Sequence, residues 1–149
     1  MNASPPVDIE LPSSLEQEAV SSALDALAPL FAGASGDHSG LFLASPNAGN
    51  ATALRFWADA MQAGVALASP QLFPWCLANA PCAALARHFG ITGPSTTWLG
   101  GDDAIASARS AAELAVSTGR VKSAFVVSVV FATSPSIPGR LRLWRIDAA

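Results

Sequence analysis

The sequence predicts an α/β fold with a mostly parallel five-stranded sheet, an antiparallel last strand and helices on both faces. Strand-like apolar runs alternate with segments of helical periodicity, and this alternation is typical of parallel sheets covered by helices. A short turn at residues 135–139 separates the last two predicted strands, so the last strand should run antiparallel to its predecessor. A chain of 149 residues fits one domain with a sizeable core.

The N-terminal residues carry weak signals. Residues 7–11 alternate in polarity before Pro12. Residues 1–12 are therefore expected to be either flexible or an edge strand, with the domain proper spanning residues 13–149. The first residues contain neither a basic leader nor an apolar run, so a cytoplasmic location is expected. No apolar stretch approaches the roughly 20 residues that a membrane helix needs.

The first helix and its following strand have clear patterns. Ser13 and Glu16 have the spacing of a capping box, and apolar residues at helical spacing continue to about Ala32. Gly33 is expected to end this helix. Residues 41–44 form a short continuous apolar run, as in a buried strand.

Two further helices are expected in the middle of the chain. Asn50 is a candidate cap for a second helix, which two prolines within residues 69–74 interrupt. A shorter third helix begins near Ala80, has Pro81 at a favoured early position and stops at Gly90.

The second half repeats the strand and helix alternation. Residues 96–99 are a β-prone run, and residues 100–103 form a tight turn that opens an Ala-rich helix ending at Gly119. Residues 123–132 are dense in Val and Phe, as in a central strand. Residues 141–146 predict the final strand.

Composition excludes several classes of function. The formal net charge is −3 and the eight Lys and Arg are scattered, which disfavours binding to nucleic acid or to an anionic membrane. Hydrophobic residues make up 51% and charged residues 13%, so part of the apolar surface is expected to face a partner protein. The two cysteines, Cys76 and Cys82, are expected to be unpaired. No metal-binding set and no cofactor are predicted.

The turn at Gly100, Gly101, Asp102 and Asp103 is the candidate site. In α/β sheets, ligands and chemistry gather at the carboxyl ends of strands, where helix N-termini present free N–H groups. A nucleophile on such a turn would have its anion stabilised by the helix. This chain has two aspartates there.

Several motifs together resemble the N-terminal half of the β-ketoacyl synthases, in the thiolase-like superfamily. These motifs are Ser69-Pro70, Phe73-Pro74, Asn79-Ala80-Pro81, Ala86 with His88-Phe89-Gly90, Gly93-Pro94-Ser95 and the Ala-rich helix after Gly101. The resemblance covers roughly residues 41–132 and implies a single thiolase-like repeat. It also implies that Asp102 occupies the position of the family's catalytic Cys.

The resemblance, together with the two points at which this sequence differs from the family, predicts a truncated, non-catalytic subunit. A carboxylate is a weak nucleophile for acyl transfer, and the chain has no room for the family's second repeat. Neither His38 nor His88 can replace the family's catalytic histidines. The leading hypothesis is a pseudo-enzyme of a fatty acid or polyketide type pathway that forms a homodimer, or a heterodimer with an active ketosynthase, as the family's chain length factors do.

Alternatives remain open for the candidate residues. Asp102 and Asp103 are favoured as simple helix caps, beside the hypotheses of a plugged acyl pocket and of a general base in another class of enzyme. The runner-up function is a small domain that binds acyl chains or acyl carrier protein. Core or loop packing is more common than ligand binding for the aromatic residues Phe56, Trp57, Phe73 and Trp75.

Two further groups of residues are candidate contacts. The first is a possible pocket or dimer interface and consists of Phe73, Trp75, Cys76, His88 and Trp98. The resemblance places residues 72–77 near the acyl tunnel and the region around the strand of the Cys position at the dimer seam. The second group is Arg140, Arg142 and Arg145, which are expected on one solvated face of the last strand, with acidic acyl carrier protein as the alternative partner.

Overall fold

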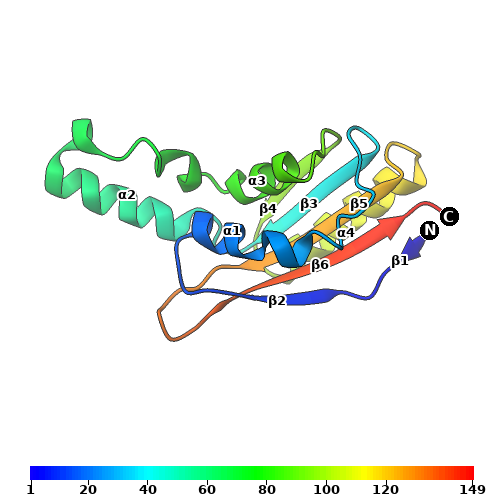
Figure 1. The fold of residues 1–149 in the computed structure, drawn as a ribbon, viewed down its shortest axis with the longest axis horizontal. Helices are drawn as coiled ribbons and strands as arrows, with labels where there is room; N and C mark the ends of the chain where they lie inside the picture. The colour runs from blue at the N-terminus through cyan, green and yellow to red at the C-terminus, as the bar shows by residue number, and fades with distance from the viewer.

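One mixed sheet organises the molecule (Figure 1). The computed structural model describes residues 1–149. The strands are β1 (Asn2–Ala3), β2 (Val7–Leu11), β3 (Ser39–Ser45), β4 (Ser95–Leu99), β5 (Ser123–Val130) and β6 (Gly139–Asp147). The sheet has six strands in the order β1-β6-β5-β3-β4, and β2 also pairs with β6. β3 is parallel to β4 and β5, whereas β6 is antiparallel to its neighbours. The predicted α/β class with an antiparallel last strand is therefore confirmed, and β1 is a sixth strand that was not predicted.

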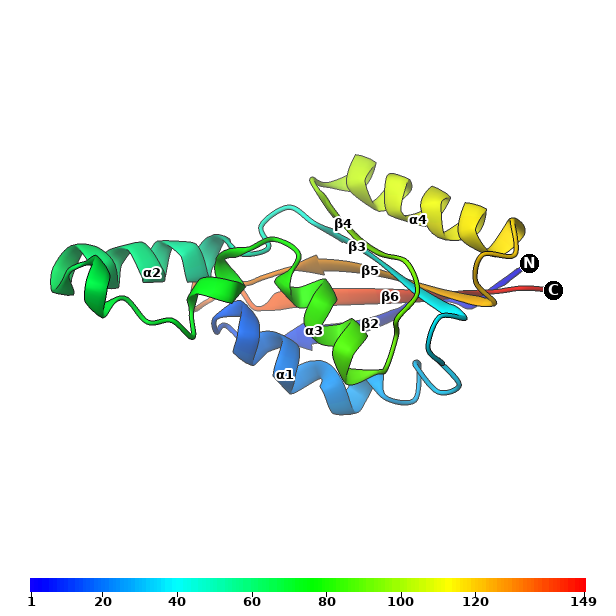
Figure 2. The same cartoon turned by 90° about the horizontal axis from the view of Figure 1, so that it is seen from above.

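Helices cover both faces of the sheet, as predicted. The α-helices are α1 (Glu16–Leu27), α2 (Asn50–Ala63), α3 (Ala80–His88) and α4 (Asp102–Ser117), and the short 3-10 helices are η1 (Val65–Leu67) and η2 (Phe73–Cys76). α1 and α3 lie on one face and α4 lies on the other (Figure 2). No helix is both long and apolar enough to span a bilayer.

The core is divided between the two faces. Beneath α1 and α3, the stacked rings of Phe31 and Phe125 lie 4.4 Å apart between their centroids, in the larger cluster of buried apolar side chains. Beneath α4, Ala104, Ala108 and Ala112 are buried against the smaller cluster. Alanine lets a helix approach the sheet closely because it has no bulk beyond Cβ. β3 is buried throughout and β5 over most of its length, which explains their mostly apolar sequences.

Glu16 does not form the predicted capping box. Leu15 is the N-terminal cap residue of α1 and makes no side-chain capping bond. The Glu16 carboxylate is fully buried and accepts hydrogen bonds from the N–H groups of Ala51 and Thr52, at 3.0 and 3.1 Å, and from the Thr52 hydroxyl. These are orphan donors in the first turn of α2. The prediction was wrong because a partner distant in sequence outcompetes the local one.

Glu16 holds the base of a protruding segment, residues 50–79, which we call the arm. It consists of α2, η1 and η2, and it extends beyond the end of the sheet (Figures 1 and 2). α2 packs mainly against η1 and η2 of the same segment, and only Thr52 and Ala60 of the helix are buried. The sheet therefore does little to stabilise α2.

Some predicted helix boundaries shift. α1 ends at Leu27 rather than near Ala32, because the backbone after Ala28 forms tighter turns. Asn50 is the first residue of α2, and the residue before it, Gly49, is the cap. Gly49 has φ +83°, and a Cβ there would lie 2.7 Å from the backbone oxygen of Cys76. Glycine is therefore required for the base of the arm to close on its returning end.

Replacement of Glu16 by Ala should loosen the arm. Two backbone donors and one hydroxyl would lose a charged acceptor inside the protein, and the free energy of unfolding should fall by about 1.5–3 kcal/mol. Urea unfolding followed by circular dichroism measures this loss. Hydrogen exchange of the Ala51 and Thr52 amides should accelerate far more than exchange in β3 or β5.

Glu18→Ala is the matched control, because Glu18 is exposed in the same turn of α1. It should change stability by no more than about 0.5 kcal/mol. Equal effects of the two substitutions would contradict the assigned role of Glu16.

Candidate functional site

The tight turn between β4 and α4 has the expected form. β4 ends at Leu99 and α4 begins at Asp102. Gly100 has φ +145°, and its N–H donates to the backbone oxygen of Ser45 at 3.0 Å. This bond ties the turn to the end of β3, so the first amides of α4 lie at the carboxyl edge of the parallel strands.

Asp102 and Asp103 are not capping residues. Gly101 is the cap, no side chain makes a capping bond, and both aspartates lie exposed in the first turn of α4. Each carboxylate stabilises the helix only through its interaction with the helix dipole, which contributes about 0.3–1 kcal/mol. Neither lines one of the main cavities. The expectation of a side-chain cap was therefore wrong.

The candidate pocket residues are dispersed over the molecule. Phe73 is exposed and contacts Phe56, while Trp75 is half-buried against the core beneath α1 and α3. Trp98 lies on the opposite face of the sheet, beneath α4, and His88 is exposed at the end of α3. They do not form one pocket.

Two aromatic residues expected in the core lie on the arm. Trp57 is exposed and Phe56 is half-buried, with their ring centroids 6.4 Å apart. The periodicity of α2 predicted a helix correctly, but it did not reveal that the sheet leaves this helix uncovered.

Both cysteines are free, as predicted, and both are poor nucleophiles. Burial, followed by the nearby Glu16 carboxylate, raises the pKa of the Cys76 thiol. Burial raises the pKa of Cys82 to about 11. At neutral pH both side chains are protonated thiols, and a thiol must lose its proton before it attacks a carbonyl.

The three C-terminal arginines do not share a face. Arg140 and Arg142 are on the face of α4, where Arg142 forms a two-point ion pair with Asp8 at 2.6 and 3.0 Å. Arg145 points to the other face, where it bonds the backbone oxygen of Ala32 and lies over the ring of Phe125. The single cationic face was therefore wrongly predicted, because strand alternation places residues an odd number of positions apart on opposite faces.

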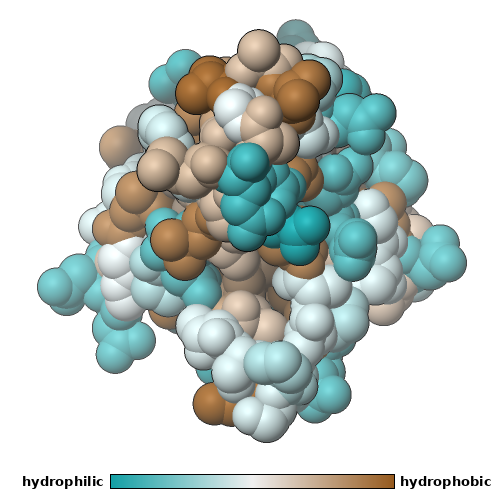
Figure 3. Space-filling view, turned by 90° about the vertical axis from the view of Figure 1, so that its left-hand side faces the viewer, coloured by the Kyte–Doolittle hydropathy of each residue, from teal (hydrophilic) through white to brown (hydrophobic).

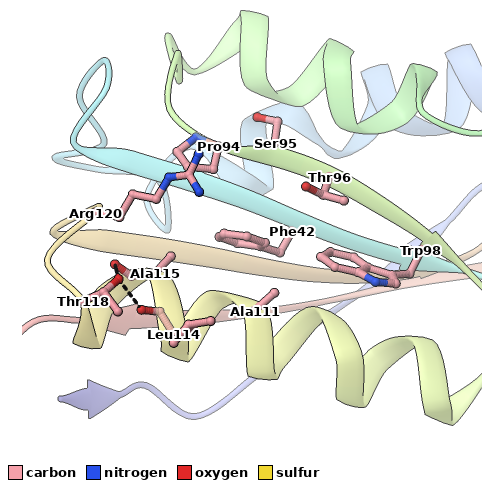
Figure 4. A pocket seen from close by; sticks show the side chains of 10 residues that line it. All are labelled: Phe42, Pro94, Ser95, Thr96, Trp98, Ala111, Leu114, Ala115, Thr118 and Arg120. Atoms are coloured by element: carbon pink, nitrogen blue, oxygen red, sulfur yellow. Dashed lines mark hydrogen bonds between the residues drawn. The ribbon is translucent and has the colours of Figure 1, made fainter.

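A groove that sequence reasoning missed runs between β4 and α4, and we call it the β4 groove. Its volume is about 490 Å³. Phe42 and Trp98 lie side by side along its floor, Leu114 of α4 forms part of its wall, and Arg120 stands at one end (Figure 4). The groove opens beside the free edge of β4, because β3 is the only strand that pairs with β4.

The arm carries most of the exposed apolar surface. Seven of the thirteen exposed large hydrophobic side chains of the chain belong to it: Leu54, Trp57, Met61, Val65, Leu67, Phe73 and Leu77. Its only charged residues, Arg55 and Asp59, pair with each other at 3.0 Å. Figure 3 views the molecule from the end to which the arm extends, where hydrophobic surface surrounds a hydrophilic patch. Exposed apolar surface of this extent is typical of a binding face.

Solved structures match this fold, although no protein-family model and no curated protein matches the sequence. The chain is similar to the ishigamide ketosynthase/chain length factor, with a TM-score of 0.66 and 20% identity, over 78% of this chain and 37% of the matched chain. Its fold is half of a thiolase-like ketosynthase fold.

Two further solved structures have a similar fold. One is the ketosynthase ApeO in complex with its chain length factor ApeC from Xenorhabdus doucetiae, with a TM-score of 0.60 and 14% identity, over 95% of this chain and 59% of the matched chain. The other is ketosynthase twelve of the bacillaene polyketide synthase from Bacillus amyloliquefaciens, with a TM-score of 0.56 and 10% identity, over 74% of this chain and 24% of that one. The chain thus spans less than two thirds of each of these three matched chains.

A cysteine introduced at Asp102 should be the most reactive thiol of the chain. Position 102 is exposed at a helix N-terminus, which lowers the pKa of a thiol, whereas burial raises the pKa of Cys76 and Cys82. Labelling of D102C with a chromogenic disulfide at pH 7 should therefore be fastest at residue 102, as located by peptide mass spectrometry.

The matched control is Ser117→Cys, exposed at the opposite end of the same helix. Its thiol should react more slowly than that of D102C because the helix C-terminus disfavours a thiolate. Faster labelling of S117C would contradict the view that the turn still offers an anion-stabilising site.

Proposed function

We propose that this protein is a non-catalytic ketosynthase-like subunit that acts by pairing with another thiolase-like subunit, in a fatty acid or polyketide type pathway. The single observation that carries the proposal is the arm, a largely apolar segment whose helix α2 packs mainly against η1 and η2 and leaves most of its large side chains exposed. The likeness to structures of ketosynthases and their chain length factors supports a partner of the same fold.

The energetics of the arm support pairing. An isolated helix of 14 residues is marginal in water, and α2 buries only two side chains within its own chain. Large side chains such as Trp57 and Met61 would lose their exposure to water at an interface, with a gain of about 25 cal/mol per Å² of apolar surface. Arg55 and Asp59 already pair with each other, and their attraction offsets part of the cost of removing both charges from water at an interface.

The turn between β4 and α4 supports a non-catalytic role. The resemblance to the β-ketoacyl synthases aligns Asp102 with the nucleophile of that family, and an exposed carboxylate does not form the thioester that carbon–carbon condensation needs. Neither native cysteine supplies a substitute, since both thiols are held in their protonated form.

Two measurements on the purified chain test the proposal. Light scattering during size-exclusion chromatography should report a mass of at least two subunits, either for the chain alone or after mixing with a ketosynthase encoded beside it. Intact mass spectrometry after incubation with acyl-loaded carrier protein should show no covalent adduct. A folded chain that stays monomeric, both alone and after mixing with the ketosynthase, would overturn pairing. An acyl adduct on the chain would overturn the non-catalytic role.

A charged residue in the arm should weaken pairing without unfolding the protein. Trp57→Glu introduces a carboxylate into the apolar surface at an exposed position, so thermal stability of the unpaired chain should change little. The dissociation constant of the pair should rise at least tenfold, equivalent to about 1.4 kcal/mol, in sedimentation equilibrium.

Ser21→Glu adds the same charge at an exposed position on α1. Its dissociation constant should stay within about twofold of the unsubstituted chain. An equal effect of both variants would show that charge, rather than the arm, controls association.

A further inference from the structure

Three of the eight basic residues of the chain gather around the ring of Trp144. The guanidinium carbons of Arg109, on α4, and Arg142, on β6, lie 5.7 and 5.9 Å from the centre of this ring. Arg140 lies on the same face of β6 as Arg142, and both line a hollow of about 140 Å³ together with Trp144. We call it the Trp144 hollow. It is open to solvent because α4 packs mainly on β3 and β5 and leaves Arg140 exposed.

The Trp144 hollow offers hydrogen-bond donors but no carboxylate. Ser128, on β5, lies directly opposite Arg142 in the sheet, and its hydroxyl forms no hydrogen bond within the chain. The side chains of Ile105 and Val130 complete the lining with apolar surface. The hollow therefore has the composition of a site for an anion, with an apolar rim.

Asp8 neutralises only one of the three arginines. Its carboxylate accepts two hydrogen bonds from the Nε and Nη2 groups of Arg142, at 2.6 and 3.0 Å. This two-point ion pair fixes the Arg142 guanidinium on the wall of the hollow and leaves its other Nη group without a partner in the chain. Arg142 is therefore held in place and can still donate to a ligand.

Arg109 and Arg140 have no carboxylate partner. The four ion pairs of the chain involve neither of them. Glu113 follows Arg109 by one helical turn, and Glu10 is the neighbour of Arg140 in the ladder of β2 and β6, yet neither carboxylate forms an ion pair. Neighbouring guanidinium groups repel one another, and an anion placed among them would be attracted by all of them at once.

A phosphate group suits this arrangement better than a carboxylate does. The donors belong to α4, β5 and β6 and approach from several directions, whereas a carboxylate presents its two oxygens in one plane to a single guanidinium fork. A phosphate monoester presents three oxygens around phosphorus and carries a charge of about −1.5 to −2 at pH 7. The two unpaired arginines, Arg109 and Arg140, match this charge.

We propose that the Trp144 hollow binds a phosphate group, either of inorganic phosphate or of a small phosphate ester. Arg140 and Arg142 supply guanidinium donors, and Ser128 supplies a hydroxyl. Arg109 adds positive charge from its position over the Trp144 ring. The site is independent of pairing through the arm, because the hollow lies on the sheet whereas the arm extends beyond the end of the sheet (Figure 1).

Titration of the purified chain with phosphate tests the site. The chain has four tryptophans, whose indole N–H groups give separate nuclear magnetic resonance signals in an isotope-labelled sample, and Trp144→Phe identifies the signal of Trp144. Inorganic phosphate and phenyl phosphate should each shift this signal to saturation at constant ionic strength, with no saturable shift at Trp57 on the arm. Acetate should bind at least about tenfold more weakly. No saturable shift, or equal affinity for acetate, would overturn the proposal.

Arg140→Gln removes one donor without disturbing the fold, because Arg140 is exposed and forms no ion pair. The dissociation constant for phosphate should rise at least about tenfold, whereas Arg109→Gln, which loses charge alone, should raise it about threefold. Arg120→Gln is the matched control, since Arg120 is exposed and unpaired but lies in the β4 groove. It should leave the dissociation constant within about twofold. Equal effects of Arg120→Gln and Arg140→Gln would overturn the site, because net charge would then control binding.

Glu10→Gln changes the charge balance in the opposite direction. Because Glu10 is the neighbour of Arg140 on β2, its neutralisation should lower the dissociation constant for phosphate by about two- to fivefold. Glu18→Gln removes the same charge from α1, on the other face of the sheet, and should leave binding unchanged. Weaker binding by Glu10→Gln would contradict a phosphate beside Arg140.

The outcomes separate the phosphate site from the proposed function. A chain that binds phosphate but stays monomeric, with and without a ketosynthase, would support the site and overturn pairing. A chain that pairs but gives no saturable phosphate shift would overturn the site alone. Tighter binding of phenyl phosphate than of inorganic phosphate would support a site for esters whose organic group packs on Ile105, and equal binding would support a site for inorganic phosphate. The titration of the unsubstituted chain decides the proposal even where a variant folds poorly.

Discussion

The carboxylate of Glu16 is the constraint on which the placement of the arm depends. It lies at the start of α1, yet its oxygens accept hydrogen bonds from the first turn of α2. A polar group buried in this way is tolerated because hydrogen bonds from three donors replace its contacts with water. The sheet gives α2 little support, so this anchor and the close contact of Gly49 with Cys76 fix the direction in which the apolar arm leaves the domain.

Three surfaces of this chain that have no partner within the chain carry little charge. The arm is largely uncharged, the β4 edge is uncharged, and the groove beside it is floored by aromatic rings. By contrast, the opposite edge carries the Asp8–Arg142 ion pair, and Arg145 is held by Asp147 and the oxygen of Ala32. Three ion pairs, Asp8–Arg142, Arg55–Asp59 and Arg145–Asp147, are formed within the chain, whereas many of its large apolar side chains are exposed. Apolar surface gives association its free energy.

Backbone contacts hold the candidate turn in place without a hydrogen bond from the side chain at position 102. Gly100 joins the turn to β3 through the Ser45 oxygen, and α4 directs its first amides at the same edge, whichever side chain stands at position 102. The chain has the fold of part of a ketosynthase and carries an aspartate at position 102. The exposed apolar arm, rather than this turn, is the feature on which we base the proposed role as a pairing subunit.

The sequence by itself determined the order of strands and helices, the antiparallel last strand and the tight turn before Asp102. These features depend on local periodicity, on glycine and on short connections, all of which a linear pattern records. Only the tertiary structure decided that Glu16 serves α2 rather than its own helix, that Trp57 is exposed, that Arg145 lies apart from Arg142 and that Phe42 and Trp98 floor a groove. Each of these depends on which segments become neighbours and which surfaces remain uncovered. An amphipathic helix has the same sequence pattern whether its apolar side meets its own sheet or another molecule.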